Sequence, residues 1–151
     1  MGPIGPSKLT RCVLDVGSQS SFVATISIDD LKLEVADRRD LLVSAFESRS
    51  SDSGPRRVAS FCAKSIWKNT TVPITAFEST HALFPHPTVP HYITIMAQTR
   101  KIKLADPREG ERDLPIEVLI RGDHYWRIIK DASTIRLSSS LVLLLRSSAG
   151  F

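Results

Sequence analysis

The chain has 151 residues, of which 42% are apolar and 24% are charged, and its formal net charge is +4. This length suits one domain and excludes a two-lobed hydrolase or a large barrel enzyme, while the composition excludes wholesale disorder. No apolar run approaches the ~18 residues that span a bilayer, and residues 1–6 lack the basic start and apolar stretch of a signal peptide. We therefore expect one domain over residues 1–151, no membrane partner and an intracellular location.

Two cysteines, Cys12 and Cys62, are too few for a disulfide framework and favour a reducing compartment. The basic residues are scattered among acidic ones, as at Arg38 and Arg39, which stand between aspartates. Because a nucleic-acid surface needs clustered positive charge, we interpret the charge mainly as a solvated surface. A small basic β-domain that binds nucleic acid is therefore the weakest of three functional interpretations.

Short strands separated by turn signals dominate the first part of the chain. Residues 8–14 predict a strand that becomes fully apolar before Asp15, where a turn follows. Residues 22–33 predict a helix with Ser20 or Ser21 as its cap, although β-branched residues weaken that pattern.

A hairpin is predicted in the middle of the chain. Residues 41–46 and 58–63 have the pattern of its two arms, and the polar turn formers of residues 47–57 predict an exposed, mobile loop between them. Residues 71–77 predict another strand, which we place at a sheet edge because Pro73 has no backbone N–H to donate.

The second half of the chain continues this pattern of short elements. Three prolines make residues 81–91 an irregular connection. The other predicted elements are strands over residues 92–96, 116–120 and 141–145, a turn over residues 105–110 and a short helix over residues 124–130. This succession of elements favours an all-β barrel or sandwich.

Asp15 is the residue of greatest chemical interest, because an apolar strand delivers it into a turn that contains Gly17. A carboxylate at the end of a buried strand is costly unless it has partners or a polar role, and glycine permits the tight backbone of the turn. Considered alone, this Asp-x-Gly triplet is typical of a turn aspartate that caps its own loop.

Three separated motifs change this interpretation. They stand in residues 13–22 (VLDVGSQSSF), 104–107 (LADP) and 116–126 (IEVLIRGDHYW). Together they resemble the aspartic peptidase domain of Pao-type (BEL/Pao) retrotransposon polyproteins, a family related to retropepsins. That family's pattern reads Leu-Leu-Asp-Ser-Gly-Ser-Gln with Ser-Phe-Ile, then Leu-Ala-Asp-Pro, then Ile-Asp-(Ile/Val)-Leu-Ile-Gly-x-Asp-(Tyr/His)-Tyr-Trp. The resemblance covers nearly the whole chain in the same order.

The resemblance implies an all-β, retropepsin-like small closed barrel with one or two short helices, one after the catalytic loop and one near His124. It implies an aspartic-type endopeptidase of a retrotransposon polyprotein, with Asp15 as the catalytic residue and a polypeptide as the substrate. Two carboxylates must share one proton in such a site, and a chain with one strand-delivered acid must form a homodimer to supply them.

The resemblance also assigns roles to the residues around Asp15, without a cofactor or a metal. The active-site loop would consist of Val16, Gly17 and Ser18. The supporting strand and turn would consist of Leu119, Ile120, Arg121 and Gly122. Residues 48–57 would form the flap that closes over substrate.

Two residues depart from the family pattern, and both bear on activity. Val16 stands where the family has a Ser or Thr whose hydroxyl braces the two carboxylates, so each unsatisfied partner should cost about 1–3 kcal/mol. Arg121 stands where the family has a Gly that lets the strand pack beneath the loop, so its side chain must clash or extend into solvent. If the turn slides by one residue, Gly122 takes over that role.

The end segments of the family pattern are short in this chain, so we expect a domain truncated at both ends. These departures favour an alternative function, that of a catalytically inactive retropepsin-like relic or binding module.

Overall fold

The computed structural model describes residues 5–43, 52–65, 71–80, 83–85, 90–104, 115–122, 124, 133–136 and 142–145. The strands are β1 (Arg11–Asp15), β2 (Phe22–Ala24), β3 (Glu34–Val43), β4 (Asp52–Lys64), β5 (Thr71–Ser79), β6 (Leu83–Pro85), β7 (Pro115–Arg121), β8 (Ser133–Arg136) and β9 (Val142–Leu145). The helices are α1 (Thr25–Asp30) and α2 (His91–Thr99). Within this part of the chain, no helix is long and apolar enough to cross a membrane.

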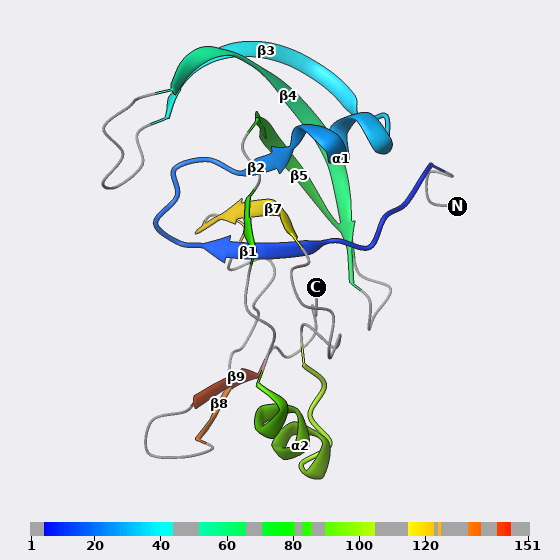
Figure 1. Cartoon of the computed structure of the whole chain (residues 1–151), viewed down its shortest axis with the longest axis vertical. Helices are drawn as coiled ribbons and strands as arrows, with labels where there is room; N and C mark the ends of the chain where they lie inside the picture. The colour runs from blue at the N-terminus through cyan, green and yellow to red at the C-terminus, as the bar shows by residue number, and fades with distance from the viewer. Residues whose placement is uncertain are drawn as a thin grey trace.

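One mixed sheet forms the main body of the molecule. Its strand order is β1-β7-β2-β5-β4-β3, with β6 added alongside β7, and β8 and β9 form a separate two-stranded ladder. β1 runs parallel to β7 and β2 runs parallel to β5, whereas the other neighbours are antiparallel. In Figure 1, β3 and β4 arch over the rest of the sheet, and α2 lies with the β8–β9 ladder at the opposite end.

The all-β class predicted from the sequence is confirmed, but the closed sheet is not. In the described strands the sheet begins at β1 and ends at β3, and these two edges do not pair with each other. The sheet of the structure is therefore open, and the expectation of a closed barrel is wrong for these strands.

The hydrophobic core lies on one face of this sheet and is closed by α1. Alternation along β5 places Val72, Ile74 and Ala76 inward and the residues between them outward. β7 instead buries nearly every residue from Ile116 to Ile120, so the side chains on both of its faces are removed from solvent. From α1, Ile28 completes the cluster at 2% exposure.

The helix predicted over residues 22–33 is shorter, because a strand occupies its first turn. Phe22 pairs with Phe77 of β5 on one side and with Leu119 of β7 on the other, and this pairing overrides local helix propensity. The α1 helix begins only at Thr25. It ends where Lys32 adopts a left-handed conformation (φ 48°) and the Leu33 amide donates to the Ile28 carbonyl at 3.0 Å.

The strand predicted over residues 92–96 is wrong, because these residues lie in α2. Thr94 and Ala97, three residues apart, are its buried positions, and Ile93 and Met96 are half-buried beside them. This spacing follows the helical period, which the short apolar run did not distinguish from alternation.

A hairpin forms in the predicted region, but the predicted arms do not face each other, because residues 41–43 pair with residues 52–54 and residues 58–60 pair with residues 34–37. β3 and β4 pair from Glu34 opposite Ser60 to Val43 opposite Asp52. Residues 52–57, predicted as part of a mobile loop, therefore belong to β4, and the rest of that loop lies outside the described residues.

Pro73 does not mark an edge strand, since β5 lies between β2 and β4. β2 reaches only Phe77–Ser79, however, and the one described strand beside Pro73 is β4. Pro73 therefore lies in a part of β5 that does not pair with β2, where a missing backbone N–H leaves no hydrogen bond to β2 unmade.

The strands predicted over residues 8–14, 116–120 and 141–145 correspond to β1, β7 and β9. Within residues 81–91, predicted as irregular, lie the short strand β6 and the start of α2. The turn at residues 105–110 and most of the helix at residues 124–130 lie outside the described residues.

Candidate active site

Asp15 is the last residue of β1, an edge strand whose described neighbour is β7. Its side chain is half-buried, and its position in the ladder is opposite Arg121. The Gly17 amide donates to Asp15 Oδ1 at 2.9 Å, and the Ser18 amide donates to the Asp15 carbonyl at 3.3 Å. The chain therefore reverses tightly after the acid, and the first turn amide holds the carboxylate.

Gly122, the residue just after β7 ends, packs against this turn. A Cβ atom added to Gly122 would lie 3.1 Å from the Cα and 3.2 Å from the carbonyl oxygen of Val16. These separations are tighter than most Cβ contacts, so a side chain at this position would require the Val16 backbone to move by a few tenths of an ångström. In this chain Gly122 packs against the loop, one residue later than the glycine of the family pattern, whose position Arg121 occupies.

Arg121 neither fills the space beneath the loop nor disrupts it. Its side chain is exposed, and its guanidinium Nη1 donates to the Gln19 carbonyl at 3.1 Å. Its backbone N–H donates to the Oγ of Ser21 at 3.1 Å, and Ser21 is buried. Arg121 therefore holds the far side of the same loop with both its backbone and its side chain.

The outer surface of the loop carries an apolar side chain. Val16 is 72% exposed, and Gly17 beside it is also exposed. Ser18 turns its hydroxyl inward within the loop, where Oγ donates to the Ser20 carbonyl at 2.7 Å. Val16 is thus an apolar side chain that this loop presents to solvent.

The supporting strand fulfils its packing role beneath the site. Ile120 is completely buried in the core, and Leu119 lies between Val13 of β1 and Phe22 of β2. The structure therefore brings together the two groups of residues that the sequence singled out: those of the Asp15 turn and those at the end of β7.

The hairpin lies on the same side of the molecule as this turn. In Figure 1, the end of the hairpin where β3 stops and β4 starts points the same way as the carboxyl end of β1. Of the residues predicted as the flap, 52–57 form the beginning of β4 and 48–51 lie outside the described residues.

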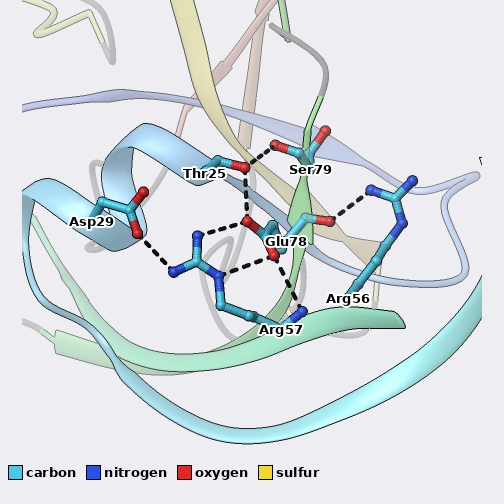
Figure 2. A network of polar contacts seen from close by, with 6 residues as sticks. All are labelled: Thr25, Asp29, Arg56, Arg57, Glu78 and Ser79. Atoms are coloured by element: carbon cyan, nitrogen blue, oxygen red, sulfur yellow. Dashed lines mark hydrogen bonds and ion pairs between the residues drawn. The ribbon is translucent and has the colours of Figure 1, made fainter. Parts of the chain in front are cut away.

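A polar network that the sequence did not predict joins β4, β5 and α1 (Figure 2). Arg57 reaches Glu78 at 2.7 Å and Asp29 at 2.7 Å, and Thr25 donates to Glu78 at 2.9 Å. The hydrogen bonds from Arg57, with a smaller contribution from Thr25, lower the pKa of Glu78 to about 2. Arg56 is buried and donates to the backbone carbonyl of Glu78 at 3.0 Å.

This network changes the interpretation of the basic residues in the hairpin. Arg57 is engaged by two carboxylates, and the Arg56 side chain is buried, so neither presents a free charge to a phosphate backbone. On the neighbouring strand, Arg39 pairs with Asp37 at 2.7 Å. These contacts argue against a nucleic-acid surface on the hairpin.

A second carboxylate lies within the apolar strand β7. Glu117 is buried, and its two oxygens accept from Lys8 Nζ at 2.6 Å and from Thr10 Oγ1 at 2.7 Å. Burial alone would raise the pKa of Glu117, but the hydrogen bonds from Lys8 and Thr10 outweigh it and lower the pKa below its ordinary value. The sequence signal was an acid inside an apolar strand, although its partners could not be read from it.

Within the described residues, no group of three or more His, Cys, Asp or Glu side chains is arranged to hold a metal ion. Neither cysteine forms a disulfide, and Cys12 is half-buried whereas Cys62 is exposed. The chain was also compared with known proteins: no protein-family model, no curated protein and no solved structure matches it.

Proposed function

We propose that this chain is the aspartic-type endopeptidase domain of a Pao-type retrotransposon polyprotein, retropepsin-like in fold and active as a homodimer. The observation that carries the proposal is the packing of the Asp15 turn on the end of β7. An ordinary turn aspartate makes its contacts within its own loop. The Asp15 turn is also contacted by Gly122 and Arg121, which lie more than a hundred residues later in the sequence.

Two further observations support the proposal. Asp15 is half-buried beside an exposed loop surface, which leaves it accessible to a second copy of the chain. The β3–β4 hairpin extends on the same side as that turn, as a flap over a substrate groove would (Figure 1).

In the proposed dimer, the Asp15 carboxyls of the two chains face each other and share one proton, because two ionised carboxylates so close together repel. The ionised member takes a proton from a water molecule, whose oxygen forms a bond to the scissile carbonyl carbon. The protonated member hydrogen-bonds to the carbonyl oxygen. The C–N bond then breaks, and a proton passes to the leaving amine. The pair titrates as a unit.

One observation favours the second candidate, an inactive relic or binding module with the same fold. The loop presents the apolar Val16 side chain to solvent, at the position where the family pattern has a hydroxyl. Valine cannot donate or accept a hydrogen bond across a dimer axis, so the carboxyls would lack that brace.

The test is a cleavage assay of the full chain at mildly acidic pH, on a peptide with apolar residues on both sides of one bond. Peptidase function predicts cleavage that a statine-type inhibitor blocks and that Asp15→Asn abolishes. The matched control is Glu34→Gln, a change at an exposed carboxylate at the start of β3, away from the end of the hairpin proposed as the flap, and it should leave the rate unchanged. Adding the Asp15→Asn chain to the unmodified chain should reduce activity more than dilution does, because mixed dimers lack one carboxyl.

A relic predicts no cleavage by the unmodified chain and a gain of cleavage in Val16→Ser, which restores the hydroxyl of the family pattern while Arg121 keeps its contacts with the loop. A folded dimer that shows no cleavage in either form would reject the peptidase proposal. Sedimentation measures the oligomeric state in parallel, since a strict monomer cannot pair two copies of Asp15.

A further inference from the structure

The pairing of β1 with β7 contains a register shift at its start. Arg11 pairs with Ile116, but the next residue, Cys12, pairs with Val118. β7 therefore advances by two residues while β1 advances by one, and Glu117 is the extra residue of a bulge. From Cys12 onward the ladder is regular, and it ends with Asp15 opposite Arg121.

The position of Asp15 depends on this bulge. If the bulge were lost and the register at Arg11 continued, Asp15 would pair with Ile120 instead of Arg121. A one-residue slip also turns every side chain of a strand to the opposite face. β1 is an edge strand with five residues, and no other described strand holds its register.

The side chain of the bulge residue binds the segment that leads into β1. Glu117 accepts from Thr10, the residue just before the strand, and from Lys8, two residues earlier. Lys8 Nζ also lies 3.4 Å from Asp30 at the end of α1. These contacts attach residues 8–10 to β7 and α1 at the one point where the ladder changes register.

We propose that Glu117 is a positioning residue, which fixes the bulged register of β1 on β7 and thereby holds the Asp15 turn against Gly122. Along a strand, four residues span about 13 Å, so Glu117 acts from beyond contact distance of Asp15. The effect of Glu117 on peptide cleavage rests on the proposed function, whereas its effect on the register does not.

The experiment compares Glu117→Gln and Lys8→Met with a matched control, Glu78→Gln. Glu78 is also a poorly exposed carboxylate in a strand, paired with Arg57, but it does not contact β1. Amide exchange measured by NMR reports on the turn through the Gly17 amide, which donates to Asp15 Oδ1. Titration of the Asp15 carboxyl carbon and the pH profile of peptide cleavage report on the acid itself.

We expect Glu117→Gln and Lys8→Met to speed exchange of the Gly17 amide by about tenfold relative to the core amides of β5. We also expect both variants to shift the Asp15 titration and the pH profile of cleavage, and Lys8→Arg to restore the behaviour of the unmodified chain. Glu78→Gln should leave the Asp15 titration and the pH profile in place. Lys8→Met keeps the test available if Glu117→Gln does not fold, since Lys8 lies outside the sheet.

Uniform acceleration of all amides, with an unmoved Asp15 titration, would overturn the positioning role and leave Glu117 as a general stabilising residue. A faster Gly17 amide in variants of a chain that cleaves no peptide would support the positioning role and reject the peptidase. An unmoved Gly17 amide in a chain that does cleave would reject the positioning role alone.

Discussion

Gly122 lies directly against the backbone of Val16, with its α-carbon facing the residue that follows the candidate catalytic acid. This contact joins a turn near the start of the chain to a strand that ends more than a hundred residues later. The chemistry proposed for Asp15 therefore depends on a site that one local segment cannot build.

Gly122→Ala should destabilise the protein by about 1 kcal/mol, because the new methyl group would lie 3.1 Å from the Val16 Cα and the turn must shift by a few tenths of an ångström to relieve this contact. Chemical denaturation measures this as a lower midpoint. Gly54→Ala is the matched control, since a Cβ at Gly54 meets nothing within 4 Å. Equal midpoints for the two variants would contradict the close packing.

Glu78→Gln should cost about 2 kcal/mol, because the change removes charge-assisted hydrogen bonds from Arg57 while that guanidinium remains largely covered. Thermal or urea unfolding of the variant measures the loss. Asp37→Asn provides the comparison, since it breaks an exposed ion pair with Arg39 and should leave the midpoint unchanged. A loss of similar size in both variants would show that burial does not govern these pairs.

The stability of the fold should decrease on acidification below about pH 4.5. The pKa of Glu78 is about 2 in the folded protein against an ordinary value of 4.5, so the unfolded chain takes up this proton first. The stabilisation is complete above about pH 4.5 and is lost as the pH falls toward 2, with a contribution of roughly 2–3 kcal/mol. The lowered pKa of Glu117 acts in the same direction.

Urea midpoints measured at intervals between neutral pH and pH 2 test this dependence. Glu78→Gln should flatten the curve in the acid range, since the variant lacks the titrating group. An unchanged slope in Glu78→Gln would mean that other groups cause the acid sensitivity.

Arg121→Met should loosen the Asp15 loop with little effect on global stability. The variant loses the hydrogen bond from the guanidinium to the Gln19 carbonyl, but it keeps the backbone bond to Ser21. Hydrogen exchange should therefore increase at residues 17–20 and remain unchanged in β5. Ser21→Ala, which removes the acceptor of the backbone bond, should have the larger effect. Equal exchange in both variants and the unmodified chain would exclude a role of Arg121 in holding the loop.

Patterns set by one strand at a time could be predicted from the sequence. The apolar run before Asp15 and the run over residues 116–120 each identified a strand, and the turn formers identified a hairpin between strands. The order of apolar and polar residues along each of these segments is enough to identify a strand.

Features that depend on partners far along the chain could not be predicted. Phe22 and Val23 form a strand because β5 and β7 lie on either side of them, whereas their own propensities left a helix open. The sequence around Arg57 is polar and predicts a loop. Arg57 lies in β4 because β3 extends far enough to pair with it, and the local sequence does not reveal that length. The bulge at Glu117 is a property of two strands and leaves no mark in either one alone.

The pairing of β1 with β7 also determines when the Asp15 turn can form during synthesis. The ribosome releases residues 11–15 early, but their partner strand ends at Arg121. Contacts between residues so far apart in sequence are slow to form, because a long loop must close first. A nascent chain that stops before residue 115 therefore carries the acid without the strand that supports it. In a protein that could cut its own precursor, such late assembly would delay any cleavage until most of the domain has left the ribosome.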